Sequence, residues 1–131
     1  MLGHSLNDFY NIRDARADRN GLIEAVLIPL RDMVLFPNMV TPLFVARERT
    51  LTAIAAAQAR EETVIGVAQR DFGESDPVSE QLYTIGTEMA LGRLMRMPDG
   101  TTSVLSQGRR RVKIVEFVQT EPFFRVRARP I

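Results

Sequence analysis

The stretch IPLRDMVLFPNMVTPLFVARERTLTAI, residues 28–54, decides the fold because prolines interrupt an apolar, β-branched run. The prolines are Pro29, Pro37 and Pro42. They exclude a helix, since proline lacks the backbone N–H that an interior helical position donates. Within sheets, proline is confined to strand starts, edges and bulges. The stretch therefore predicts two short strands, around residues 25–30 and 39–45, joined by a bent loop.

At the end of this stretch, the spacing of the apolar residues changes to the spacing of a helix. In RERTLTAIAAAQAR, residues 47–60, the apolar residues recur about every 3.6 residues and alanine is frequent, which predicts one α-helix. Residues 71–80, DFGESDPVSE, are typical of a polar loop. The remaining apolar segments predict strands at 63–69, 83–96, 101–107, 109–118 and 123–131. The chain is therefore predicted to be a β-rich domain with one helix.

Turn residues separate these later strands. Met97-Pro98-Asp99-Gly100 combines the fixed φ of proline with the positive φ that glycine allows, which predicts a tight hairpin turn. Gly108 indicates a bend or bulge, and Glu121-Pro122 a further turn. In the last strands basic and apolar residues alternate, so one face is expected in the core and the other in water.

Length and composition indicate one ordinary globular domain. The chain has 131 residues, of which 45% are hydrophobic and 25% charged. No apolar run approaches the roughly 20 residues of a membrane-spanning helix, and the absence of cysteine fits a reducing compartment. We therefore expect a cytoplasmic protein without a membrane partner. Residues 1–23 are predicted to be a tail or a short frayed helix, and the strand that ends at Ile131 suggests a fragment of a larger chain.

The inventory of reactive residues argues against catalysis. His4 and Lys113 are the only histidine and lysine, and cysteine is absent. A serine-histidine-aspartate triad would need His4, close to the start of the chain, and Lys113 is not followed by the Ser or Thr of a P-loop. A zinc site would lack its Cys and His ligands. The acids Asp71, Glu74, Asp76 and Glu80 could ligate calcium, but they lack the EF-hand spacing and are more typical of a solvated loop. We expect no catalytic residue, no cofactor and no metal in this chain.

The opening stretch is followed by an ordered set of motifs. Downstream of it come VAQRD (67–71), LYTIGT (82–87) and PDGT (98–101). Within it, the residues that belong to the same pattern are Pro29, Leu30, Arg31, Phe36, Pro37, Met39, Pro42, Leu43 and Arg47. This ordered set resembles the N-terminal domain of the Lon ATP-dependent protease family. The resemblance covers about residues 24–131, which predicts a Lon-type domain over that range.

The resemblance implies a fold and a function. The fold is a PUA-like pseudo-barrel of about six strands with one α-helix. The function is recognition of unfolded or degron-bearing proteins and support of a homo-hexamer, with chemistry confined to the ATPase and protease domains of the full-length chain. ATP and Mg²⁺ are expected only in those domains, so the isolated domain is expected to be inert.

A receptor for many unfolded sequences needs an adaptable apolar surface, and methionine suits it because its side chain is flexible and polarizable. The candidate patch consists of Met33, Leu35, Phe36, Met39, Met95 and Met97. These residues lie in or beside the predicted loops and hairpin ends. The alternative is that they fill the core, and the sequence leaves both possibilities open.

Two other functions remain as alternatives. The base-rich stretch from residue 92 to 131 permits a PUA-like RNA-binding module, although nucleic acid is the less expected partner. A stand-alone Lon-like domain that binds a small ligand, as in cereblon, uses an aromatic cage of tryptophans, and this chain has no tryptophan.

Overall fold

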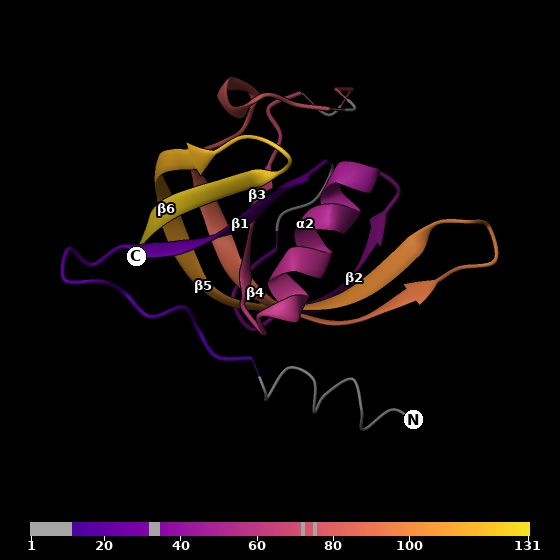
Figure 1. Cartoon of the computed structure of the whole chain (residues 1–131), viewed down its shortest axis with the longest axis horizontal. Coiled ribbons are helices and arrows are strands. Elements are labelled where there is room, and N and C mark those ends of the chain that lie inside the picture. Colours follow the sequence, from indigo (N-terminus) through magenta and orange to yellow (C-terminus); the bar gives the residue numbers. More distant parts are fainter. Residues whose placement is uncertain (1–11, 32–34, 72, 75) are drawn as a thin grey trace.

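The computed structural model describes residues 12–31, 35–71, 73–74 and 76–131 (Figure 1). Over these residues the chain is mainly β, with six strands in one sheet and one α-helix. The elements are β1 (Ile23–Leu30), β2 (Val40–Val45), α2 (Glu48–Ala59), β3 (Val64–Ala68), a short 3₁₀ helix η1 (Ser79–Gln81), β4 (Ile85–Arg96), β5 (Thr102–Gln119) and β6 (Phe124–Pro130). The predicted fold class is confirmed.

Strand pairing closes most of the sheet into a ring. The strand order is β2-β5-β4-β3-β1-β6, and β6 also pairs with β5, so β5, β4, β3, β1 and β6 form a closed pseudo-barrel. All pairs are antiparallel except β1 with β3. Strand β2 pairs only with the first part of β5, so it is the edge strand of the sheet. Pro42 lies in β2, where an edge strand tolerates the missing N–H.

Strand β1 is buried on both faces and separates two apolar clusters. Ala25 and Leu27 join the cluster inside the barrel, with residues of β3, β5 and β6. Val26, Ile28 and Leu30 join the second cluster, which packs against Ala53, Ile54 and Ala57 of α2. Because both faces are covered, β1 has a nearly continuous apolar sequence. Helix α2 lies across this outer face of the sheet (Figure 1).

The hairpin of β4 and β5 is the longest feature of the fold. Its turn is the predicted one: the Met97 N–H donates to the Thr101 carbonyl over 2.7 Å, and Gly100 has φ of 91°. The far end of the hairpin extends away from the barrel (Figure 1). Beyond the hairpin, the predicted Glu121-Pro122 turn joins β5 to β6.

Strand β5 corrects one detail of the sequence analysis. The chain does not divide into two strands at Gly108, because β5 runs continuously from Thr102 to Gln119. The expected irregularity is a register shift: Met89 pairs with Gly108 while Glu88 pairs with Arg110, so Arg109 is the extra residue. A β-bulge of this kind bends a strand without ending it. Bending lets β5 pair with β2 in its first half and with β6 in its second.

A buried carboxylate fixes the N-terminal segment to the barrel. Residues 12–22 contain no helix and lie extended apart from a turn at 19–21. The Ala15 N–H donates to Glu88 Oε2 over 2.7 Å, and the Ala15 carbonyl accepts from Arg110. Glu88 also pairs with the Arg110 guanidinium and accepts from the Thr63 hydroxyl over 2.6 Å.

No helix in the described part of the chain is long and apolar enough to span a membrane.

Candidate functional site

The structure divides the predicted apolar patch. Leu35 is 1% exposed and packs in the cluster under α2, so its side chain is part of the core and not of a surface patch. Met33 lies outside the described residues. Phe36, Met39 and Met95 are exposed at 53%, 38% and 61%, while Met97 is half-buried. The exposed members can therefore meet a partner, and Leu35 cannot.

Phe36 and Met39 lie where the loop after β1 crosses β5. The Asn38 N–H donates to the Gly108 carbonyl over 2.9 Å, and the Gly108 N–H donates to the Met39 carbonyl over 2.8 Å. Asn38 has φ of 68°, the left-handed conformation that asparagine tolerates better than most residues. These bonds attach the loop to β5, so Phe36 is exposed on a loop whose backbone is hydrogen-bonded to the sheet.

Met95 belongs to a second surface, on the projecting hairpin. It pairs with Ser103 of β5, and Ser103 pairs on its other side with Phe44 of β2. Residues directly opposite in a sheet share a face, so Phe44, Ser103 and Met95 form one exposed row. Phe44 is 68% exposed. The next row, Leu43, Val104 and Leu94, faces the core.

The two surfaces are separate. Gly108 and Ser103 are about 16 Å apart along β5 at the usual rise per residue. The edge strand β2 connects them with its outward residues Val40, Pro42 and Phe44. The sequence analysis missed Val40 and Phe44. The signal was present in VTPLFV, since a proline that marks an edge strand also predicts that alternate apolar residues face water.

A groove of about 440 Å³ opens beside Leu35. Its floor is β3, at Gly66 and Ala68. The side chains of Leu30 and Met89 fill the space directly above Gly66, where each lies 2.9 Å from the position of an added Cβ. Leu30 lines it from β1, and Ile85 and Arg111 line it from the other side of β3. This volume lies within the range of about 300–1,000 Å³ that is usual for ligand sites. The groove continues the face of the sheet that α2 covers elsewhere, which explains its apolar lining.

Two arginine–aromatic pairs lie at this groove. The Arg70 guanidinium carbon is 4.7 Å from the ring centre of Tyr83, a lining residue. The Arg111 guanidinium carbon is 5.0 Å from the ring centre of Phe36. Tyr83 and Ile85 are 46% and 42% exposed, so the groove has apolar walls open to solvent. No carboxylate among the described residues lies within ion-pair distance of either guanidinium.

Four of the nine basic residues between positions 92 and 131 form ion pairs. Arg109 pairs with Asp14 at 2.9 Å, and Arg110 pairs with buried Glu88. Arg125 and Arg127 both pair with Glu24. The Arg125 hydrogen bond lowers the pKa of the Glu24 carboxyl, since it stabilises the charged form. These ion pairs occupy only part of the base-rich end of the sequence. Among the described residues, no carboxylate lies within ion-pair distance of Arg93, Arg96, Arg111, Lys113 or Arg129.

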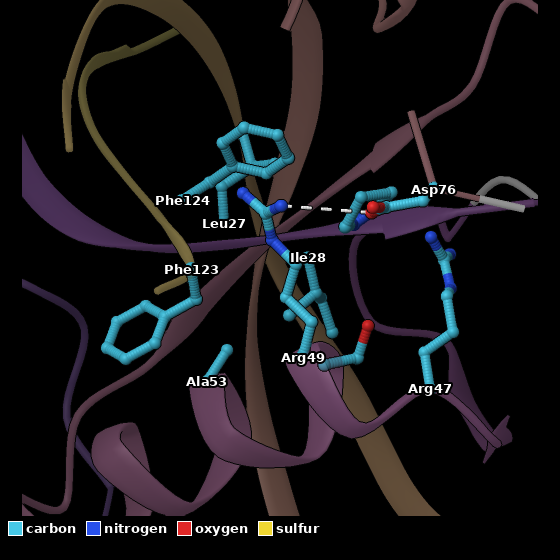
Figure 2. Close-up of a pocket in the computed structure, with 10 residues that line it drawn as sticks. Leu27, Ile28, Arg47, Arg49, Ala53, Asp76, Phe123 and Phe124 are labelled. Carbon is cyan, nitrogen blue, oxygen red and sulfur yellow. Dashed lines mark ion pairs between the residues drawn. The ribbon is translucent and has the colours of Figure 1, made fainter. Parts of the chain in front are cut away.

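A smaller cavity, of about 10 Å³, lies beneath the first turn of α2 (Figure 2). Arg49 crosses it, with its guanidinium carbon 4.6 Å from the ring centre of Phe124 and its Nη1 3.8 Å from Asp76. Arg49 also donates to the Thr120 carbonyl and to Glu121. The space holds about one water molecule, so this site is structural and not a ligand pocket.

The acidic loop at residues 71–80 is tied to the same region. Gln69 is fully buried, and its amide nitrogen donates to the carbonyls of Asp71 and Glu74 over 3.1 and 2.8 Å. The Arg47 guanidinium donates to the Gln69 side-chain oxygen over 3.4 Å, and partial burial lowers the pKa of Arg47. No group of three or more potential ligands for a metal ion occurs among the described residues. The loop is therefore held through the backbone carbonyls that Gln69 contacts and through the Asp76 carboxylate that pairs with Arg49.

Solved structures similar to this fold support its class. The N-terminal domain of Mycobacterium avium complex Lon protease matches with a TM-score of 0.62 and 18% identity, over 82% of this chain and 53% of that one. The Lon N-terminal domain protein from Xanthomonas campestris matches with a TM-score of 0.61 and 18% identity, over 82% of this chain and 58% of that one. At this identity, the likeness shows the fold alone.

Sequence relatives identify the family. Lon protease 2 of Herpetosiphon aurantiacus is 46% identical over 77% of this chain, and Lon protease 3 of Sorangium cellulosum is 38% identical over 86%. The chain covers 12% and 13% of these relatives' lengths. A family model described as the ATP-dependent protease La (Lon) substrate-binding domain matches residues 24–131. The chain therefore belongs to the Lon substrate-binding domain family.

Proposed function

We propose that this domain recognises unfolded or degron-bearing proteins for a Lon-type ATP-dependent serine protease. The observation that carries the proposal is the combination of this family with apolar side chains exposed on the β2–β5–β4 part of the sheet and on the loop bonded to Gly108. Phe36, Phe44 and Met95 are each more than half exposed. Contiguous exposed apolar residues mark interaction sites, and methionine adapts to different partners.

In this proposal the domain is the non-catalytic part of the enzyme. Its partners are the ATPase and protease domains of the full-length chain, and ATP and Mg²⁺ act there. Six copies in a homo-hexamer would bind one long substrate at several weak sites, which raises the overall affinity through effective concentration. We place this function in the cytoplasm. Light scattering of the full-length protein with and without residues 1–131 tests whether the domain supports the hexamer.

The main experiment is a titration of the isolated domain with a labelled unfolded polypeptide and with a labelled single-stranded RNA, each at low and high salt. Apolar contacts are strengthened or barely changed by salt, whereas RNA binding weakens steeply because counterions compete for the phosphates. We expect weak, salt-tolerant binding of the polypeptide alone. Salt-sensitive binding of RNA with none of the polypeptide would overturn the proposal.

Surface variants connect this binding to the structure. Phe44→Ser combined with Met95→Ser removes the exposed row on the hairpin, and both side chains lie outside the core. We expect the double variant to weaken polypeptide binding severalfold without changing the urea midpoint. Val115→Ser is the matched control, since Val115 is also exposed, at 48%, but lies on the other half of β5.

RNA binding is the second candidate function, and ion pairs occupy four of the nine basic residues at 92–131 that it would use. Phosphate contacts need cationic side chains that are available to solvent. In this structure Arg109, Arg110, Arg125 and Arg127 already contact carboxylates. The titration above therefore tests RNA as an alternative and not as a second activity of the same surface.

A further inference from the structure

The groove beside Leu35 combines two features that no other described surface shares. Its floor and walls are apolar, with Gly66 and Ala68 below and Leu30 and Ile85 at the sides. Its two arginines, Arg70 and Arg111, are held by aromatic rings and not by carboxylates. An apolar hollow with cations at its margin fits a ligand that is itself apolar in the middle and acidic at its ends.

Stacking on an aromatic ring leaves the N–H donors of a guanidinium group able to bond to acceptors. Arginine presents its N–H donors around the edge of a plane, so a ring that covers the face leaves the edge open to a carboxylate. The guanidinium carbons of Arg70 and Arg111 lie over the Tyr83 and Phe36 rings, 4.7 and 5.0 Å from the ring centres. Lys113 lies opposite Ile85 in the β4–β5 pairing and adds a third positive charge. Among the described residues, none of these three cations has a carboxylate within 4.0 Å.

The spacing along the groove sets the spacing in the ligand. The chain bends at Thr84, so about 13 Å is the upper limit of the distance between Tyr83 and Thr87, and Thr87 is the neighbour of Arg111 in the sheet. In an extended peptide, residues i−2, i and i+2 face the same way, and the outer two are also about 13 Å apart. Carboxylates two residues before and two after an apolar residue would therefore reach the two arginines together.

We propose that this groove binds an extended segment of an unfolded protein in which an aliphatic or aromatic residue has an acidic residue two positions before it and another two positions after it. The apolar side chain lies over Ala68, between Leu30 and Ile85, and the carboxylates meet Arg70 and Arg111. This inference rests on the proposed function and names the class of segment that the domain selects.

The test uses four peptides with a terminal fluorophore and fluorescence anisotropy on the unaltered domain. The reference peptide is Gly-Ser-Asp-Ser-Leu-Ser-Asp-Ser-Gly. The others replace both Asp by Lys, replace Leu by Ser, or move each Asp next to the Leu, which keeps composition and charge but turns the carboxylates to the other face. We expect the reference peptide to bind about fivefold tighter than the shifted peptide, and tighter still than the other two.

Variants locate the binding. Arg70→Gln combined with Arg111→Gln is expected to weaken the reference peptide about fivefold. Arg96→Gln combined with Arg129→Gln removes the same charge from exposed positions elsewhere and is expected to have no effect. Ala68→Leu fills the floor of the groove and is expected to weaken the peptide about tenfold. Because a new side chain at position 68 can alter folding, the peptide series on the unaltered domain decides the question by itself.

The possible outcomes distinguish a failure of this inference from a failure of the proposed function. Equal binding of the reference, shifted and lysine peptides by a domain that still binds unfolded polypeptide would overturn the inference alone. A domain that binds no polypeptide would overturn the proposed function as well. Single-stranded RNA that competes with the reference peptide, and whose own binding the Arg70→Gln and Arg111→Gln double variant abolishes, would assign the groove to nucleic acid and overturn both.

Discussion

Gly108 and Phe36 are in direct backbone contact. A Cβ atom on Gly108 would overlap the Phe36 carbonyl oxygen and would also lie 3.3 Å from the Pro37 Cα. The loop after β1 therefore crosses β5 at the one place where β5 has no side chain. This contact positions Phe36 at the surface and Leu35 in the core.

Replacing Gly108 by alanine is expected to lower the free energy of unfolding by about 1–3 kcal/mol, because the loop or the strand must shift to make room. Urea denaturation of the variant measures the change. Gly73→Ala is the matched control, since a Cβ there meets only the Asp71 side chain, at 3.3 Å. A Gly108→Ala midpoint equal to that of the control would show that the contact is not restrictive.

Glu88 is predicted to stabilise the fold and to attach residues 12–22 to the barrel. Its side chain is fully buried and accepts from Thr63 and Ala15. Glu88→Gln directs an amide group toward these donors and leaves Arg110 without its carboxylate, so we expect a loss of about 2 kcal/mol or more in unfolding free energy. Hydrogen exchange at the Ala15 amide should accelerate. Exposed Glu116→Gln is the control, and equal stability of the two variants would contradict a role of Glu88 in fixing residues 12–22.

The pH dependence of stability is predicted from Glu24. The hydrogen bond from Arg125 lowers its pKa in the folded state below the ordinary 4.5, so folding favours the charged form. Its contribution is therefore present above pH 4.5 and is lost as the pH falls through the lowered pKa. Glu24→Gln should destabilise the domain slightly at pH 7, by less than about 1 kcal/mol for this exposed pair. The difference should disappear in strong acid, and a difference that grows on acidification would refute this prediction.

Arg49 joins α2 to the β5–β6 turn and to Asp76 (Figure 2). Arg49→Ala removes both the stacking on Phe124 and the hydrogen bond to Thr120, and we expect a loss of about 1–2 kcal/mol. Arg49→Lys should recover less than half of that loss, because an ammonium group lacks the planar fork. Thermal and urea unfolding of both variants check this. Full recovery by lysine would show that only the charge matters.

Much of the fold follows from local sequence signals. The period of residues 47–60 places α2 within two residues of its ends, and the Pro98-Asp99-Gly100 turn appears as predicted. These features depend on φ preferences and on side-chain spacing within one segment. The continuity of β5 through Gly108 was not predictable in this way, because it depends on partners in β2, β4 and β6.

The candidate site was less predictable than the fold. Leu35 and Phe36 are adjacent in the sequence and equally apolar, yet one is 1% and the other 53% exposed. Arg70 and Arg111 resemble Arg109 and Arg110 in sequence, but only the latter two meet carboxylates. The exposure of a side chain and the ion pairing of an arginine depend on residues far away in the chain, so no local sequence pattern predicts them.

The sequence by itself determined the class of the fold, the position of its helix and hairpin turn, and the resemblance to the Lon family. Prolines, glycines and apolar periods act on their own segments, so their effects are readable without neighbours. Only the tertiary structure decided which apolar side chains reach the surface and which arginines lack a carboxylate. Closing β5, β4, β3, β1 and β6 into a ring brings distant segments together, and those new neighbours set burial and charge.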